Sequence, residues 1–229
     1  MRAPRRALLA APALLGARPA AARDVLDTLL VLAMDASGSI DADEFALQRE
    51  GYAEALTHPA VLAAIRSRPR GAIGVAILEW GTPGGSQLIV DWMAISSDAS
   101  AQAVAEALLA APRSTQSWNA IGDAIHHASH LLREGPFTAD NLVIDVSGDG
   151  PDLRSLRPAP IARDIVVRRG MVVNALAIAA SGQVTRAGEP LEDHYRRDVI
   201  GGPGAFVLTA ENRRDLARAL RTKLIREVS

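Results

Sequence analysis

The stretch TLLVLAMDASGS, residues 28–39, joins a continuous apolar run to a loop of short oxygen-bearing side chains. An unbroken apolar run of this length is typical of a central parallel strand that helices cover on both faces. The loop that follows the run contains Asp35, Ser37 and Ser39. Ligands of open α/β sheets bind beyond the carboxyl ends of such strands. The stretch therefore predicts an α/β fold with a functional site directly after its first strand.

Apolar strands and amphipathic helices alternate along the rest of the chain. The strands expected at residues 72–78 and 87–92 are linked by GTPGG at residues 81–85, which is too short for a crossover helix and predicts an antiparallel hairpin. The whole pattern is that of a doubly wound α/β fold, a mostly parallel sheet with one antiparallel edge hairpin and helices on both faces. Further strands are expected at residues 142–146, 171–178 and 204–208, and helices at residues 41–56, 98–110, 119–133, 161–169 and 212–225.

A second polar loop, SGDG at residues 147–150, follows the expected strand LVIDV. Since functional loops of such sheets lie at the carboxyl ends of the strands, the polar side chains of both loops are expected to meet around one point. The polar side chains of these loops offer only oxygen ligands, which favours Mg²⁺, Mn²⁺ or Ca²⁺ over zinc or copper. We expect a divalent cation, with Mg²⁺ first and Mn²⁺ or Ca²⁺ as alternatives. Asn119 lies between the two loops in the chain, at the start of the helix expected at residues 119–133, and is expected nearby. The candidate metal ligands are Asp35, Ser37, Ser39, Asn119 and Asp149.

A simpler interpretation needs no metal. Asp35 and Ser37 would only cap the next helix, and Asp149 would lie in an ordinary turn. Capping alone does not require matched loops after two different strands, so the metal site is the favoured interpretation.

The order of these motifs resembles the von Willebrand factor A domain over residues 25–225. Asp-x-Ser-x-Ser after an apolar strand is similar to the first motif of that family's metal-ion-dependent adhesion site (MIDAS), and residues 119–125 and 147–150 are similar to its other two segments. More narrowly, SGDGP at residues 147–151 and VIGGPG at residues 199–204 resemble a group of uncharacterised exported bacterial members.

The resemblance implies a role for each candidate ligand. Ser37 and Ser39 would bind the metal through their hydroxyls, and Asp35 and Asp149 would bind it directly or through water. Asn119 stands where the family has a threonine. An amide oxygen still ligates a hard cation, but the hydroxyl that moves in and out of the shell in switching members is missing. Thr115 and Ser117 are the nearby alternatives for this position.

The function implied by the resemblance is protein binding. The cation would recognise an acidic group, Asp or Glu, on another protein, with Trp118 as an aromatic rim, and no catalysis is expected. One alternative is a metal-dependent, phosphatase-like hydrolase on a similar sheet, and another is a structural domain with a vestigial metal site. Nucleophile-elbow and nucleotide-binding motifs are absent from the sequence.

Residues 1–22 are interpreted as an export signal that precedes a von Willebrand factor A-like domain at residues 23–229. Arginines, a short apolar run and Ala20-Ala21-Ala22 follow one another in the order of a signal peptide. Cleavage would take the net charge from −1 to −5 by removing the four arginines of this segment. We therefore expect a periplasmic or secreted protein with no affinity for nucleic acid and no further membrane segment.

Other notable residues receive simpler interpretations. His126 and His130 have the i,i+4 spacing of metal ligands but no evident third ligand, so a solvated helix face is favoured. Trp80 and Trp92 are expected to pack in the core. Asp145, a charge inside an apolar strand, is expected to pair with an arginine.

Overall fold

The computed structural model describes residues 23–179, 182–211 and 213–229, so the expected export signal at residues 1–22 lies outside the described residues. Six strands of the described part form one sheet. In chain order they are β1 (Asp24–Asp35), β2 (Ile73–Trp80), β3 (Gln87–Ile95), β4 (Phe137–Gly148), β5 (Val172–Ile178) and β6 (Val207–Ala210).

The strand expected to decide the fold, β1, lies near the middle of this sheet. The strand order is β3-β2-β1-β4-β5-β6, and β2 and β3 are antiparallel while all other neighbours are parallel. The predicted fold class and edge hairpin are therefore confirmed. Every β1 residue from Leu26 to Asp35 is buried, and the parallel register sets Met34 beside Ser147 of β4. The two polar loops thus leave the sheet at the same edge.

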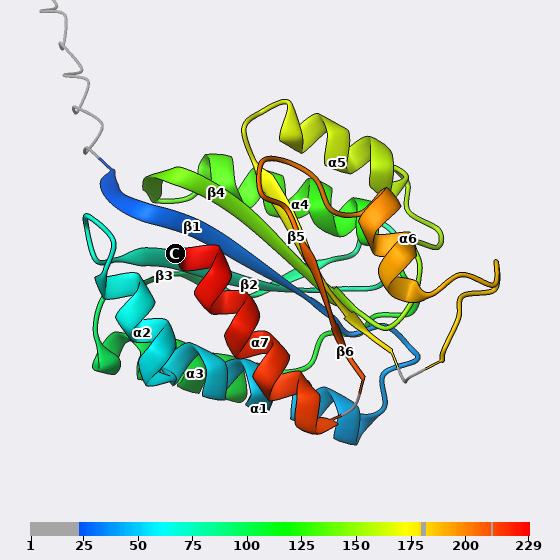
Figure 1. The fold of residues 1–229 in the computed structure, drawn as a ribbon, viewed down its shortest axis with the longest axis horizontal. Helices are drawn as coiled ribbons and strands as arrows, with labels where there is room; N and C mark the ends of the chain where they lie inside the picture. The colour runs from blue at the N-terminus through cyan, green and yellow to red at the C-terminus, as the bar shows by residue number, and fades with distance from the viewer. Residues whose placement is uncertain (1–22, 180–181, 212) are drawn as a thin grey trace, which may run out of the picture.

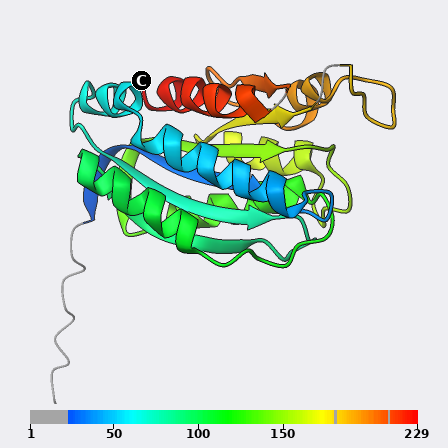
Figure 2. The same ribbon diagram turned by 90° about the horizontal axis from the view of Figure 1, so that it is seen from below.

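Helices cover both faces of the sheet, which explains why β1 has no polar side. Figure 1 shows α4, α5 and α6 on one face and α1, α2, α3 and α7 on the other, and Figure 2 views the second group from its own side. The helices are α1 (Ala42–Thr57), α2 (Pro59–Arg66), α3 (Asp98–Ala110), α4 (Ile121–Glu134), α5 (Ala159–Val167), α6 (Leu191–Asp198) and α7 (Arg213–Val228).

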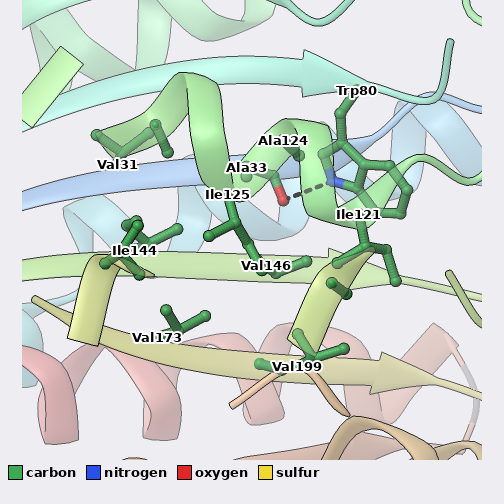
Figure 3. Close-up of a cluster of buried hydrophobic side chains, with 14 of the residues drawn as sticks. Val31, Ala33, Trp80, Ile121, Ala124, Ile125, Ile144, Val146, Val173 and Val199 are labelled. Carbon is green, nitrogen blue, oxygen red and sulfur yellow. Dashed lines mark hydrogen bonds between the residues drawn. The ribbon is translucent and has the colours of Figure 1, made fainter. Parts of the chain in front are cut away.

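The apolar core has one layer on each face of the sheet. In the layer under α4, Ile121 and Ile125 are fully buried against the sheet. Trp80, at the end of β2, is buried in the same layer and donates from Nε1 to the carbonyl oxygen of Ala33 at 3.0 Å (Figure 3). This buried indole fills the core directly beneath the loops that leave β1 and β4.

Two short helices were not expected from the sequence. Helix α2 begins at Pro59, one residue beyond the C-cap that ends α1, and eight residues show too few turns for a clear apolar period. Helix α6 is mostly charged and buries only Leu191, His194 and Tyr195, so its sequence carries little hydrophobic signal.

The last strand begins three residues later than predicted. Gly204 has a φ of +73°, in the left-handed region, which is incompatible with extended strand backbone. Strand β6 therefore starts at Val207 and is only four residues long.

The expectation that Asp145 pairs with an arginine is wrong. The partner of Asp145 is Lys223 of α7, the only lysine in the chain, and both side chains are fully buried. Lys223 Nζ also lies 2.7 Å from Glu227 Oε1. The pairing arises because α7 packs on the face of the sheet from which the Asp145 side chain projects, and the sequence pattern does not specify this.

Candidate metal site

The loop after β1 is shaped by hydrogen bonds to its own side chains. The carboxylate of Asp35 is fully buried, and its Oδ1 accepts the backbone N–H of Ser37 at 2.8 Å. The hydroxyls of Ser37 and Ser39 lie 3.0 Å apart. The loop then passes into α1, where Asp41 is the N-cap and forms a capping box with Glu44. These local bonds turn the chain so that one carboxylate and two hydroxyls lie close together.

The loop after β4 meets the first loop directly. The backbone N–H of Asp149 donates to Oδ2 of Asp35 at 3.3 Å. A Cβ on Gly148 would lie 2.6 Å from the hydroxyl of Tyr195, so only glycine fits at this position. Strand pairing and this close backbone approach bring the half-buried Asp149 next to Asp35.

Asn119 reaches the site from the segment 111–120, which joins α3 to α4. A Cβ built on Gly150 would lie 2.3 Å from Asn119 Nδ2, so the amide lies directly against the β4 loop. Its Oδ1 is buried and has no hydrogen-bond partner among the described residues. A buried carbonyl oxygen without a partner costs free energy unless something binds it. The orphaned oxygen therefore fits a cation ligand.

The sequence placed Asn119 at the start of a helix, but α4 begins only at Ile121 with Ala120 as its N-cap. Of the two alternatives for this position, Ser117 has its hydroxyl 3.2 Å from Thr82 Oγ1, and Thr115 is exposed. The loop conformation thus presents the Asn119 amide to the β4 loop.

The segment 111–120 is held in place by contacts that the sequence gave no reason to expect. The N–H of Gly38 donates to the carbonyl of Ser117 at 3.3 Å, and the N–H of Ala120 donates to the carbonyl of Gly81 at 3.0 Å. A Cβ on Gly81 would lie 2.8 Å from the carbonyl oxygen of Trp118. Gly81, which reads as a plain hairpin residue in the sequence, is therefore required for the close approach of this segment.

A buried ion pair supports the same segment from below. Arg49 of α1 donates to Glu79 of β2, and the other oxygen of Glu79 accepts the N–H of Ser114 at 2.7 Å. Arg49 also donates to the carbonyls of Leu108 and Pro112 at 3.0 and 3.2 Å. The only sequence signal for this arrangement was a glutamate near the end of an apolar strand.

The electrostatics of the site favour a bound cation. Burial, and secondly the negative charge of Asp149, raise the pKa of Asp35 to about 7 from its ordinary value of 3.8. A divalent cation between the two carboxylates would offset both effects, because it stabilises the charged form of each. Two carboxylates, two hydroxyls and one amide form an oxygen set that suits a hard cation.

Trp118 and the histidines occupy different surroundings. Trp118 is 47 % exposed and directly precedes Asn119.

The histidines of α4 lie close to one another. The rings of His126 and His130 are 4.7 Å apart, and His126 Nδ1 lies 2.8 Å from Arg157 Nη1. No group of three or more histidine, aspartate or glutamate side chains within the described ranges is placed to hold a metal.

The fold is similar to several solved structures. Pilus adhesin SpaC from Lactobacillus rhamnosus GG shares 14 % identity over 90 % of this chain and 31 % of its own, with a TM-score of 0.63. Proximal thread matrix protein 1 from the mussel byssus, with a zinc-occupied MIDAS motif, shares 15 % over 88 % of this chain and 45 % of its own, with a TM-score of 0.59. A von Willebrand factor type A protein from Catenulispora acidiphila shares 18 % over 87 % of this chain and 42 % of its own, with a TM-score of 0.58.

These likenesses show a von Willebrand factor A-like fold, and this chain spans less than half the length of each of the three. Among curated proteins, none matches the sequence significantly. Within the described ranges, none of the helices combines the length and apolar character needed to span a bilayer. One family model matches residues 24–229, nearly the whole chain. The chain therefore belongs to the family described as "Protein of unknown function (DUF1194)".

Proposed function

We propose that this protein is an exported binding module that uses a divalent cation to recognise an acidic group on another protein. The observation that carries the proposal is the convergence of two strand-end loops, in which the N–H of Asp149 bonds to the carboxylate of Asp35. The proposed ligands are Asp35, Ser37, Ser39, Asn119 and Asp149.

The orphaned oxygen of Asn119 supports a cation at this point. A structural domain with a vestigial site would gain nothing from a buried carbonyl oxygen that no donor satisfies. The same holds for a buried carboxylate next to a second carboxylate. A cation that these groups share would satisfy both, which is the physical reason to prefer a working site.

Binding suits this ligand set better than catalysis. Mg²⁺ prefers an octahedral shell of six oxygen ligands, and the five proposed ligands leave one position of that shell open. A carboxylate oxygen of a partner would fill this position. The similar folds of a pilus adhesin and of a byssus protein with a zinc-occupied MIDAS motif support this choice.

Export is proposed from the first 22 residues of the sequence, as a signal peptide followed by one domain at residues 23–229. Expression of the full chain with mass spectrometry of the exported product tests this. A mature protein that begins at Arg23 is expected, and an uncleaved protein in the cytoplasm would refute it.

Calorimetric titration tests the site itself. Mg²⁺, Mn²⁺ and Ca²⁺ are titrated into protein stripped with EDTA, alongside Asp35→Ala and the matched control Asp91→Asn, an exposed aspartate of β3. Saturable binding that Asp35→Ala abolishes and Asp91→Asn preserves is expected. No binding at millimolar metal would leave a structural domain as the better description.

A further inference from the structure

Arg154 adopts a backbone conformation that arginine normally avoids. Its φ is +72°, and it is the only non-glycine residue with a positive φ in the described part of the chain. In this region the Cβ of an L-residue lies too close to the following carbonyl oxygen, so the conformation persists only where the surrounding structure enforces it. Residues held in this way cluster at functional sites.

Hydrogen bonds on both sides of Arg154 enforce the conformation. The N–H of Leu153 donates to the carbonyl of Asn119 at 2.5 Å. The N–H of Leu156 donates to the carboxylate of Asp123 at 3.0 Å. One of these anchors is the backbone of a proposed metal ligand, so the position of Arg154 is coupled directly to the metal site.

The side chain of Arg154 stacks on the exposed ring of Trp118. The guanidinium carbon lies 4.5 Å from the ring centroid, and Trp118 is the residue before Asn119. The described part of the chain gives Arg154 no ion-pair partner. Stacking fixes the plane of a guanidinium but leaves its in-plane N–H groups available, and these match a carboxylate in two parallel hydrogen bonds.

Two exposed apolar side chains lie close to Arg154 in the chain. Leu153 is 40 % exposed and Leu156 is 78 % exposed, on either side of Arg154 in the chain. Tryptophan and arginine are enriched in the hot spots of binding interfaces. We call Trp118, Leu153, Arg154 and Leu156 the rim.

We propose that Arg154, oriented by Trp118, binds a second carboxylate on the same partner segment whose first carboxylate is bound by the cation. The inference rests on the proposed function and adds the chemistry of the partner. The partner segment carries two acidic residues at a defined short spacing, and apolar side chains beside them contact Leu153 and Leu156. Arg154 is then a specificity-determining residue, because a partner with one acidic residue leaves its guanidinium unpaired.

A peptide array in Mg²⁺ buffer tests the inference. Its peptides carry either one Asp or two acidic residues at separations of one to several positions, with Asn and Gln peptides as blanks. For the wild-type protein, doubly acidic peptides of one spacing are expected to bind about tenfold more tightly than singly acidic ones, as one added charge-assisted contact predicts.

The variants separate the rim from the metal. Because the Arg154 side chain is exposed, the melting temperature of Arg154→Gln is expected to match the wild type. Its preference for the second acid is expected to be lost, because the amide carries no charge. Trp118→Ala is expected to weaken the same preference. Arg169→Gln, an exposed arginine beyond α5, is the matched control and is expected to keep it.

The possible failures are distinguishable. Mg²⁺-dependent binding of singly and doubly acidic peptides with equal affinity would overturn the inference and leave the proposed function standing. Retention of the preference in Arg154→Gln would also overturn it. Binding of no acidic peptide in Mg²⁺ would overturn the proposed function and the inference together.

Discussion

Arg49 and Glu79 form an ion pair of 2.7 Å beneath the candidate metal site, and both side chains are almost completely buried. The pair links α1 to the end of β2. Its hydrogen bonds to backbone groups also hold the start of the segment 111–120, which carries Asn119. A contact within the scaffold thus determines where a proposed ligand lies.

Glu79→Ala is expected to destabilise the protein and weaken metal binding. Removing one partner leaves the Arg49 charge buried and unpaired, which costs about 3–5 kcal/mol. Urea unfolding measures the loss, and metal titration is expected to show weaker binding because the segment 111–120 is released. Glu54→Ala, an exposed glutamate of α1, is the control. A change below about 1 kcal/mol would contradict the account, since surface substitutions usually stay in that range.

Asp149→Asn is expected to stabilise the metal-free protein while abolishing its metal response. The substitution removes the negative charge that acts on the buried Asp35 carboxylate and keeps the backbone N–H that bonds to it. A gain of about 1 kcal/mol in the free energy of unfolding is expected from the relieved repulsion.

Thermal melts of the wild type and Asp149→Asn, with and without Mg²⁺, measure both expected effects. The wild type is expected to gain stability with Mg²⁺ through binding to the native state, whereas Asp149→Asn is not. Equal Mg²⁺ responses in both proteins would place the cation elsewhere.

Asn119→Ala is expected to separate binding from stability. Because the buried Asn119 Oδ1 has no hydrogen-bond partner among the described residues, its removal is expected to leave the melting temperature of the metal-free protein unchanged or slightly higher. The affinity for Mg²⁺ is expected to fall by about tenfold or more, as for groups that support a metal site. Paired melting and calorimetry measure both quantities. A large loss of stability with unchanged affinity would make Asn119 a structural residue.

The buried charged cluster of Lys223 and Glu227 of α7 with Asp145 of β4 predicts a pH dependence of stability. Burial, and then the negative charge of Asp145, raise the pKa of Glu227 to about 8 from its ordinary 4.5, against the opposing charge of Lys223. The folded state therefore holds a proton on Glu227 that the unfolded state releases. Stability is expected to be greatest below the ordinary value and to fall as pH rises toward about 8, by up to about 1.4 kcal/mol per pH unit.

Glu227→Gln is the test of this dependence. The variant keeps the shape of the side chain and cannot ionise, so its unfolding free energy is expected to fall less over the same pH range. Urea unfolding of both proteins across the range gives the difference profile. Parallel profiles would show that another group controls the dependence.

Much of the fold could be predicted because its signals are local. Apolar runs such as the one before Asp35 indicate buried strands wherever they occur, and the short link at Gly81 allows only a hairpin. The helices α2 and α6 were missed because they are short and leave no clear apolar period in the sequence. The late start of β6 follows from the left-handed backbone of Gly204.

The candidate site was also partly predictable from the sequence. By itself, the sequence determined that Asp35, Ser37 and Ser39 share one loop, because hydrogen bonds between residues two apart shape that loop. It also specified which types of oxygen ligand are present, and hence which class of cation fits.

Only the tertiary structure decided other contacts between distant segments. The pairing of Lys223 with Asp145 and the hydrogen bonds that hold the backbone of Arg154 join segments that are far apart in the chain. Each depends on how whole helices and loops pack on the sheet, because a long-range contact forms only where the core has already brought its partners together. No local pattern of residues encodes that outcome.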